Sequence, residues 1–188
     1  MSLDWQLGDL QTSSKGIRSA PISDAKGGPI VFQLTSSKAP LTAPFGSSAF
    51  NDPTATRQNI CFRCTPELEK KMTDVDAWMM QYILDNSQRL FKNKTVTYKP
   101  CLSLKEDYPA LLRTKINVGG SKTCRFWNMF GKRIEAPENM KECMLVPRVV
   151  VRSLWVMGSE CGLIIEVTDM MYDEKEEECP FPIDQPLL

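Results

Sequence analysis

One segment of the chain repeats its apolar residues at the spacing of an α-helix. Between Pro66 and Asp85 an apolar residue recurs every three or four positions, at Leu68, Met72, Val75, Met79, Tyr82 and Ile83. Thr65 stands where an N-cap belongs, Pro66 occupies the first helical position, and two glutamates follow in the first turn. The pattern therefore predicts one amphipathic helix from Pro66 to about Asp85.

The rest of the apolar pattern is typical of short strands. Continuous or alternating apolar runs predict strands at residues 29–35, 59–64, 95–99, 111–118, 122–130, 144–157 and 161–171. Gly119-Gly120 predicts a hairpin between residues 111–118 and 122–130, and Gly158-Ser159-Glu160 predicts a second one between the last two strands. Several short strands, one helix and glycine-marked corners favour an α+β, mainly β fold, a partly open β-barrel of the OB type.

Length and composition indicate one domain with two polar ends. A chain of 188 residues with 42% hydrophobic content can build one core and is short for two. We expect a flexible N-terminal arm over residues 1–28, a single OB-like nucleic-acid-binding domain over 29–172, and an acidic, Pro-rich tail over 173–188. No apolar run approaches the roughly 18 residues of a membrane span, and the polar start lacks a secretory signal. The sequence therefore predicts an intracellular protein of the nucleus or cytoplasm.

The net charge of zero conceals a division along the chain. Between Ser87 and Arg152 there are fourteen Lys and Arg residues and five acids, whereas residues 169–188 hold seven acids and one Lys. A basic, strand-forming region with aromatic residues among its cations can bind a polyanion and stack bases. The alternative is that these cations only solvate a surface. An acidic tail on the same chain can compete for the basic region or recruit a partner.

The alternation of residues gives a set of candidate nucleic-acid-binding side chains. If residues 111–118 and 122–130 form a ribbon, one of its faces carries Arg113, Lys115, Arg125 and Trp127. The full set of candidates comprises Lys99, Arg113, Lys115, Lys122, Arg125, Lys132 and Arg133 for the backbone, and Phe45, Tyr98 and Trp127 for stacking. In the alternative arrangement Trp127 faces the core. Trp155 shares parity with Val149 and Val151, so we assign it to the core.

The sequence offers little support for catalysis, a metal or a cofactor. It contains no histidine, the commonest general base and metal ligand. Cys61-Phe62-Arg63-Cys64 has the spacing of a redox dithiol or half a zinc site, but no second CxxC completes the ligands, and two buried side chains at a strand end are the favoured interpretation. Without a secretion signal the seven cysteines are expected to be reduced. We therefore predict a non-enzyme with no metal and no cofactor.

A succession of short stretches is similar to a known protein family. The stretches are Gly28–Gln33, Ala43–Gly46, Tyr98–Pro100, Tyr108–Lys115, Leu154–Gly158 and Cys161–Val167. Through them the chain resembles the single-stranded DNA-binding OB-fold proteins of nucleocytoplasmic large DNA viruses and their protist relatives. The resemblance implies an OB-like barrel, binding of single-stranded DNA without strong sequence preference, and no catalytic centre. Residues 176–182 are also similar in composition to the acidic, Phe-bearing tails with which bacterial and phage single-strand-binding proteins recruit replication partners.

Together these patterns predict a protein that binds single-stranded DNA or RNA by aromatic stacking and Lys/Arg–phosphate contacts. Its expected partners are single-stranded nucleic acid and, through the acidic tail, replication or repair proteins; an oligomer is compatible with the sequence. The alternative is a protein–protein interaction module that uses an apolar, aromatic surface and the acidic tail. A continuous basic groove lined by aromatic residues would favour the first hypothesis, and a flat apolar patch the second.

Overall fold

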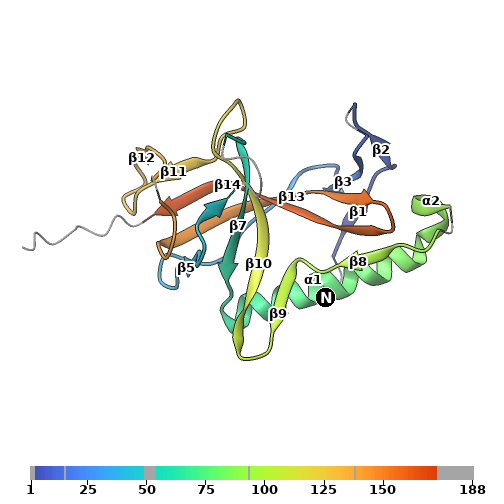
Figure 1. Cartoon of the computed structure of the whole chain (residues 1–188), viewed down its shortest axis with the longest axis horizontal. Helices are drawn as coiled ribbons and strands as arrows, with labels where there is room; N and C mark the ends of the chain where they lie inside the picture. Colours follow the sequence, from blue (N-terminus) through green and yellow to red (C-terminus); the bar gives the residue numbers. More distant parts are fainter. Residues whose placement is uncertain (1–2, 15, 49–53, 93, 138, 173–188) are drawn as a thin grey trace, which may run out of the picture.

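The computed structural model describes residues 3–14, 16–48, 54–92, 94–137 and 139–172 (Figure 1). The elements within these residues are, in chain order, β1 (Trp5–Leu7), β2 (Gln11–Thr12), β3 (Arg18–Asp24), β4 (Ile30–Gln33), β5 (Leu41–Thr42), β6 (Ser47–Ser48), β7 (Arg57–Arg63), α1 (Pro66–Asp85), α2 (Ser87–Phe91), β8 (Thr97–Lys99), β9 (Leu102–Lys105), β10 (Tyr108–Asn117), β11 (Arg125–Trp127), β12 (Arg133–Ile134), β13 (Met144–Met157) and β14 (Glu160–Tyr172). The acidic tail at 173–188 lies outside the described residues.

Helix α1 has the bounds that the apolar spacing predicts. Thr65 is its N-cap, and its side-chain oxygen accepts a hydrogen bond from the backbone N–H of Leu68 at 3.3 Å. The apolar stripe is buried at Leu68, Met72, Val75, Met79 and Ile83. This face packs against the sheet, so the helix covers one side of it (Figure 1). None of the described helices is long and apolar enough to cross a membrane.

The centre of the sheet is a long antiparallel hairpin of β13 and β14, as the glycine turn predicts. The strands pair from Leu145 with Tyr172 to Met157 with Glu160, and Gly158 turns the chain with a φ of 59°. The register shifts twice, between Arg148 and Val149 and between Val151 and Ser153. A bulge reverses the inward and outward alternation beyond it, so both shifts change which side chains face the core.

Three strands continue the sheet along the other edge of β14, all parallel to it. In order along that edge they are β8, β10 and β11. Strand β10 also pairs with β7, which pairs with β6, and the main path runs β1-β3-β13-β14-β10-β7-β6. The two ends of this path do not pair, so the barrel is partly open. This confirms the predicted fold class, mainly β with an OB-like open barrel.

The N-terminal residues differ from the flexible arm expected for 1–28. Strand β3 pairs with β13, from Pro21 with Ser153 to Arg18 with Val156, and β1 and β2 pair with β3. Leu7, Ala20 and Ile22 are buried in the core. The described part of this segment therefore belongs to the sheet. Its strands are short and separated by polar turns, and β3, on which β1 and β2 depend, pairs with the distant β13, which local sequence cannot indicate.

Candidate functional site

The outer face of β14, opposite the core, carries the candidate site. Its centre is formed by the outward-facing side chains of β14 and of the strands that flank it, and we call this surface the binding face. Two hollows lie on it, about 300 Å³ and about 470 Å³ in volume. The first lies toward the β13–β14 turn, and the second lies where β14 pairs with β11. The binding face brings together most, but not all, of the candidates named from the sequence.

The first hollow gathers three of the predicted cations around a tryptophan. Lys99 from β8 and Arg113 and Lys115 from β10 line it, together with Trp155 of β13. The Arg113 guanidinium donates to the carbonyls of Pro100 at 3.0 Å and of Leu102 at 3.4 Å, which holds it at the rim.

Lys115 and Lys99 are also held by neighbouring side chains. The ammonium group of Lys115 donates to the side-chain oxygen of Asn59. Burial, followed by the nearby Arg57, lowers the pKa of Lys115. Lys99 forms an ion pair with Glu160 at 2.8 Å. The three cations therefore point into one hollow with their positions set by hydrogen bonds or ion pairs.

Trp155 lies on the binding face and not in the core, where its parity with Val149 and Val151 had placed it. The register shift between Val151 and Ser153 moves it to the outer side. A Cβ atom on Gly162 would lie 2.8 Å from Nε1 of Trp155, so the absence of a side chain at 162 lets the indole lie across β14. Trp155 is half-buried and does not belong to the core, against which Trp5 and Trp78 pack.

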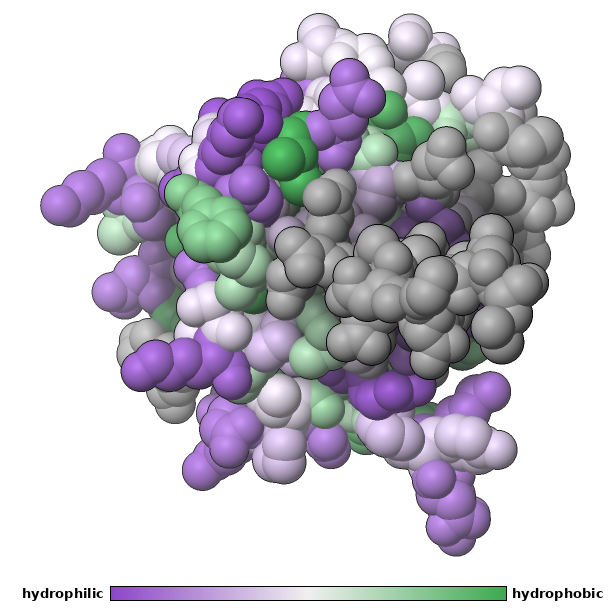
Figure 2. All heavy atoms as spheres, turned by 90° about the vertical axis from the view of Figure 1, so that its left-hand side faces the viewer, coloured by the Kyte–Doolittle hydropathy of each residue, from purple (hydrophilic) through white to green (hydrophobic). Residues whose placement is uncertain are grey.

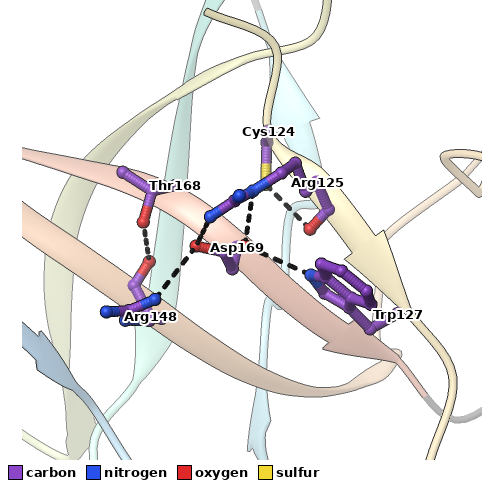
Figure 3. A network of polar contacts seen from close by, with 6 residues as sticks. All are labelled: Cys124, Arg125, Trp127, Arg148, Thr168 and Asp169. Atoms are coloured by element: carbon purple, nitrogen blue, oxygen red, sulfur yellow. Dashed lines mark hydrogen bonds and ion pairs between the residues drawn. The ribbon is translucent and has the colours of Figure 1, made fainter. Parts of the chain in front are cut away.

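The second hollow holds the other predicted tryptophan beside a buried carboxylate. Arg125 and Trp127 of β11 line it together with Arg148 and Asp169 (Figure 3). Asp169, only 9% exposed, accepts from Nε of Arg125 at 2.7 Å, from Nη2 of Arg125 at 2.9 Å and from Nε1 of Trp127 at 3.2 Å. The guanidinium of Arg133 lies 5.7 Å from the centre of the Trp127 ring, within cation–π range.

The pKa of Asp169 follows from this network. Burial raises it, but the hydrogen bonds from Arg125, Trp127 and Thr168 outweigh burial, so the pKa lies below its ordinary value. The carboxylate is therefore charged at neutral pH. It fixes an arginine and an indole on the binding face at the same time.

A second buried carboxylate lies on β14 between the residues that line the two hollows. Glu166, 6% exposed, accepts from Nη2 of Arg152 at 2.7 Å and forms an ion pair with Arg57 at 3.6 Å. Together with Arg148, which lies 3.8 Å from Asp169, these arginines cover the floor of the binding face. The face is thus a row of cations over two paired acids. Neither acid was identified from the sequence, because each lies among apolar residues of β14 without a local motif.

The ribbon expected from the sequence is not a hairpin. Strands β10 and β11 do not pair with each other, because the N–H of Cys124 donates to the carbonyl of Asn117 at 2.7 Å and closes residues 118–123 into a loop. The chain then continues in its original direction along β14. The predicted grouping is still found, since Lys115 pairs with Glu166, Arg125 with Asp169 and Trp127 with Met171 on one face of β14.

The remaining candidates lie elsewhere. Lys122 is exposed in the closed loop, and Lys132 is exposed in the turn between β11 and β12. Phe45 is 68% exposed between β5 and β6, where it lines neither hollow. Phe130, which was not among the candidates, is 95% exposed at the β11–β12 turn. The end of the molecule that carries this turn shows apolar patches set among hydrophilic side chains (Figure 2).

Tyr98 is held inside the structure and does not present a free ring. Its hydroxyl donates to Oδ1 of the buried Asp76 at 2.6 Å, and its ring packs against the core. Burial, followed by the charge of Asp76, raises the pKa of Tyr98. The same carboxylate accepts from the backbone N–H groups of Cys101 at 3.0 Å and Leu102 at 3.3 Å. Tyr98 and Asp76 thus attach α1 to the segment that carries Lys99.

Three thiols, those of Cys61, Cys64 and Cys124, lie in environments that favour the protonated form. Burial is the main cause in each case, and it raises the pKa of Cys61, that of Cys64 to about 11 and that of Cys124 to about 12. No group of three or more Cys, Asp or Glu side chains able to hold a metal ion is found among the described residues.

Comparisons with known proteins place this geometry in a structural context. No protein-family model matches the chain, and no curated protein matches it in sequence. Among solved structures it is similar to gp2.5, a single-stranded DNA-binding protein encoded by bacteriophage T7, with a TM-score of 0.55 and 9% identity, over 86% of this chain and 100% of that one. The likeness is one of fold. It agrees with the OB-like barrel.

Two further solved structures are of the single-stranded DNA-binding protein from bacteriophage Enc34. The C-terminally truncated form has a TM-score of 0.46 and 8% identity, over 93% of this chain and 98% of that one. The form in complex with single-stranded DNA has a TM-score of 0.48 and 10% identity, over 94% and 99%. The resemblance to the viral and protist family is not confirmed by any of these comparisons.

Proposed function

We propose that the chain binds single-stranded nucleic acid, DNA in the first instance, along the binding face and without strong sequence preference. The observation that carries this proposal is the position of Trp127 and Trp155, each half-buried in its own hollow beside arginine or lysine side chains on one sheet face. Base stacking on an aromatic ring is worth about 1–3 kcal/mol and tolerates any base. The cations supply the phosphate contacts, and no catalytic step is involved. The fold likeness to a phage single-stranded DNA-binding protein supports this choice.

The distribution of charge on the binding face sets the expected salt dependence. The described side chains of the two hollows and of the surface between them include three paired carboxylates, Glu160, Glu166 and Asp169. They also include seven cations: Arg57, Lys99, Arg113, Lys115, Arg125, Arg148 and Arg152. The net excess is about four positive charges. Each phosphate contact with a single strand contributes about −0.7 to the slope of log affinity against log salt. We therefore expect a slope of about −3, which is moderate for a nucleic-acid-binding protein.

A titration of labelled oligothymidylate, followed by fluorescence anisotropy at several salt concentrations, tests the proposal. Trp127→Ala and Trp155→Ala should each weaken binding by about 1–3 kcal/mol. Tyr108→Ala is the matched control, because this tyrosine is 73% exposed at the β9–β10 turn and lines neither hollow. If the wild-type protein binds no oligonucleotide at low salt, the proposal is wrong and the interaction-module hypothesis is favoured.

The same titration also decides the roles of the peripheral candidates. Phe45→Ala, Lys122→Gln and Lys132→Gln remove side chains that lie outside the hollows. An effect smaller than that of either tryptophan variant would agree with binding centred on β14. An RNA strand of matched length and base composition compares the two nucleic acids.

A further inference from the structure

A third hollow lies at the end of the molecule where α2 and β2 meet, close to the β13–β14 turn (Figure 1). It has a volume of about 480 Å³, and we call it the end hollow. Four cations line it, Arg18 from β3 and Arg89, Lys92 and Lys94 from α2 and the residues after it, against the single acid Asp9. A hollow with this excess of positive charge attracts a polyanion.

The side chain of Arg89 is held by its neighbours, and hydrogen bonds fix the backbone at Lys92 and Lys94. The guanidinium of Arg89 donates to the hydroxyl of Tyr82 at 3.2 Å and lies 3.5 Å from the largely exposed carboxylate of Asp9. Lys92 ends α2 in the left-handed conformation, with its N–H bonded to helix carbonyls, and the N–H of Lys94 donates to the carbonyl of Phe91 at 3.0 Å. Lys92 and Lys94 thus line the same hollow as Arg89.

The end hollow and the binding face lie on opposite sides of the sheet. Arg18 shares parity with the buried Ala20 and Ile22, so it lies on the side covered by the helices. Its neighbour Ser19 pairs with Trp155, which faces the first hollow. Only the end of the sheet separates the two sites.

A short cationic segment joins them around this end. Lys94 lines the end hollow, and β8 begins three residues later at Thr97, whose N–H donates to the carbonyl of Ser159 in the β13–β14 turn. Strand β8 ends at Lys99, which lines the first hollow. Cations therefore lie on both sides of the turn, Lys94 in the end hollow and Lys99 in the first hollow, where Lys99 pairs with Glu160 of the turn.

We propose that the end hollow binds the sugar–phosphate backbone of the same nucleic-acid strand after it leaves the first hollow, so that the strand bends around the β13–β14 turn. This inference rests on the proposed function. The short path from the end hollow to the binding face, through β8, favours nucleic acid over an acidic protein segment as the ligand. Phe91, the aromatic residue that lines this hollow, is buried, so the contacts are made to phosphates and not to stacked bases. A longer strand gains these contacts, and a short one does not.

A length series of labelled oligothymidylates tests the proposal on the full chain. The variant is Lys92→Gln with Lys94→Gln, which keeps a polar side chain, shorter by one atom, and removes the charge. The matched control is Lys26→Gln with Lys105→Gln, two exposed lysines that line none of the three hollows. Wild type and control should gain affinity with length beyond the point at which the variant levels off. For the longest strand the salt slope of the variant should be shallower by about 1.4, which corresponds to two lost contacts.

The short strands in the same series separate the possible results. With strands that fill only the binding face, the double variant should bind like the wild type. Arg18→Gln, which removes the cation that β3 contributes to the end hollow, should show the same dependence on strand length as the double variant. An equal loss of affinity at every length would mean that the lysines act through the general field, and no loss at any length would mean that the strand does not reach them. Either result overturns the inference while leaving the proposed function intact. A wild-type protein that binds no strand of any length would overturn both.

Discussion

Asp169 offers a way to separate the charge of the binding face from its geometry. Its carboxylate is a hydrogen-bond acceptor for both Arg125 and Trp127 (Figure 3). Asp169→Asn removes the negative charge but leaves an amide oxygen that can accept from the indole. Asp169→Ala removes the charge and the acceptor together. The two variants therefore add the same charge to the face, and only the second releases Trp127.

The loss of the negative charge and the release of Trp127 should change the affinity in opposite directions. Loss of one negative charge beside a bound phosphate tightens binding by about 1 kcal/mol or less at separations near 4 Å in water, and it steepens the salt slope by about 0.7. Release of Trp127 forfeits stacking worth about 1–3 kcal/mol. We therefore expect Asp169→Asn to bind a few-fold more tightly than the wild type. Asp169→Ala should bind about fivefold more weakly, since about 1.4 kcal/mol corresponds to a factor of ten.

Fluorescence anisotropy with one oligothymidylate at low salt measures all these affinities. Glu160→Gln is the control for charge alone, because Glu160 forms an ion pair with Lys99 and is hydrogen-bonded to no aromatic side chain in the described structure. It should behave like Asp169→Asn. Thermal melting should fall by about 2–4 °C in the Asp169 variants, the effect of losing about 1 kcal/mol in a chain of this size. If Asp169→Ala binds as tightly as Asp169→Asn, the positioning of Trp127 contributes nothing and the reasoning is refuted.

Three further results are expected. Tyr98→Phe should lower the free energy of unfolding by about 2 kcal/mol through the lost hydrogen bond to the buried carboxyl group of Asp76, with affinity unchanged; a large loss of affinity in a folded variant would restore Tyr98 as a stacking residue. Burial lowers the pKa of Lys115, so this side chain loses its charge at a lower pH than an ordinary lysine, whereas the arginine of Lys115→Arg stays charged. As the pH rises toward about 10, the affinity of the wild type should therefore begin to fall at a lower pH than the affinity of Lys115→Arg. Identical pH profiles would contradict this. Deletion of residues 173–188 should tighten binding, most visibly at low salt, with the melting temperature nearly unchanged; unaltered affinity would show that the acidic tail is no competitor.

The features that local sequence predicts are those that local contacts determine. Helix α1 keeps its expected bounds because its cap, its first-turn acids and its apolar stripe all lie within its own residues. The β13–β14 hairpin is also local, since Gly158 adopts the left-handed conformation that closes the turn. Arg113 and Lys115 alternate with buried neighbours as expected, so their outward direction could be read from β10 alone.

The features that the sequence did not predict depend on distant strands. Gly119-Gly120 was interpreted as a hairpin turn, but the hydrogen bond from Cys124 to Asn117 returns the chain to its original direction, and β11 finds its partner in β14. Trp155 was assigned to the core because the alternation of inward-facing and outward-facing side chains was assumed to continue without interruption along β13. The bulge after Val151 exchanges the inward-facing and outward-facing positions of β13, and it arises in the pairing of β13 with β14.

The paired acids also change how the charge of this chain should be interpreted. The large excess of cations between Ser87 and Arg152 counts charges along the sequence, but on the binding face Glu166 and Asp169 lie beneath the arginines and neutralise part of them. On the proposed function, we therefore expect a moderate affinity for the phosphate backbone alone, and we expect discrimination to come from the two tryptophans. A duplex keeps its bases stacked inside and offers nothing to either ring, whereas a single strand can place its bases on both. The positioned indoles, more than the net charge, are what should make a single strand the preferred ligand.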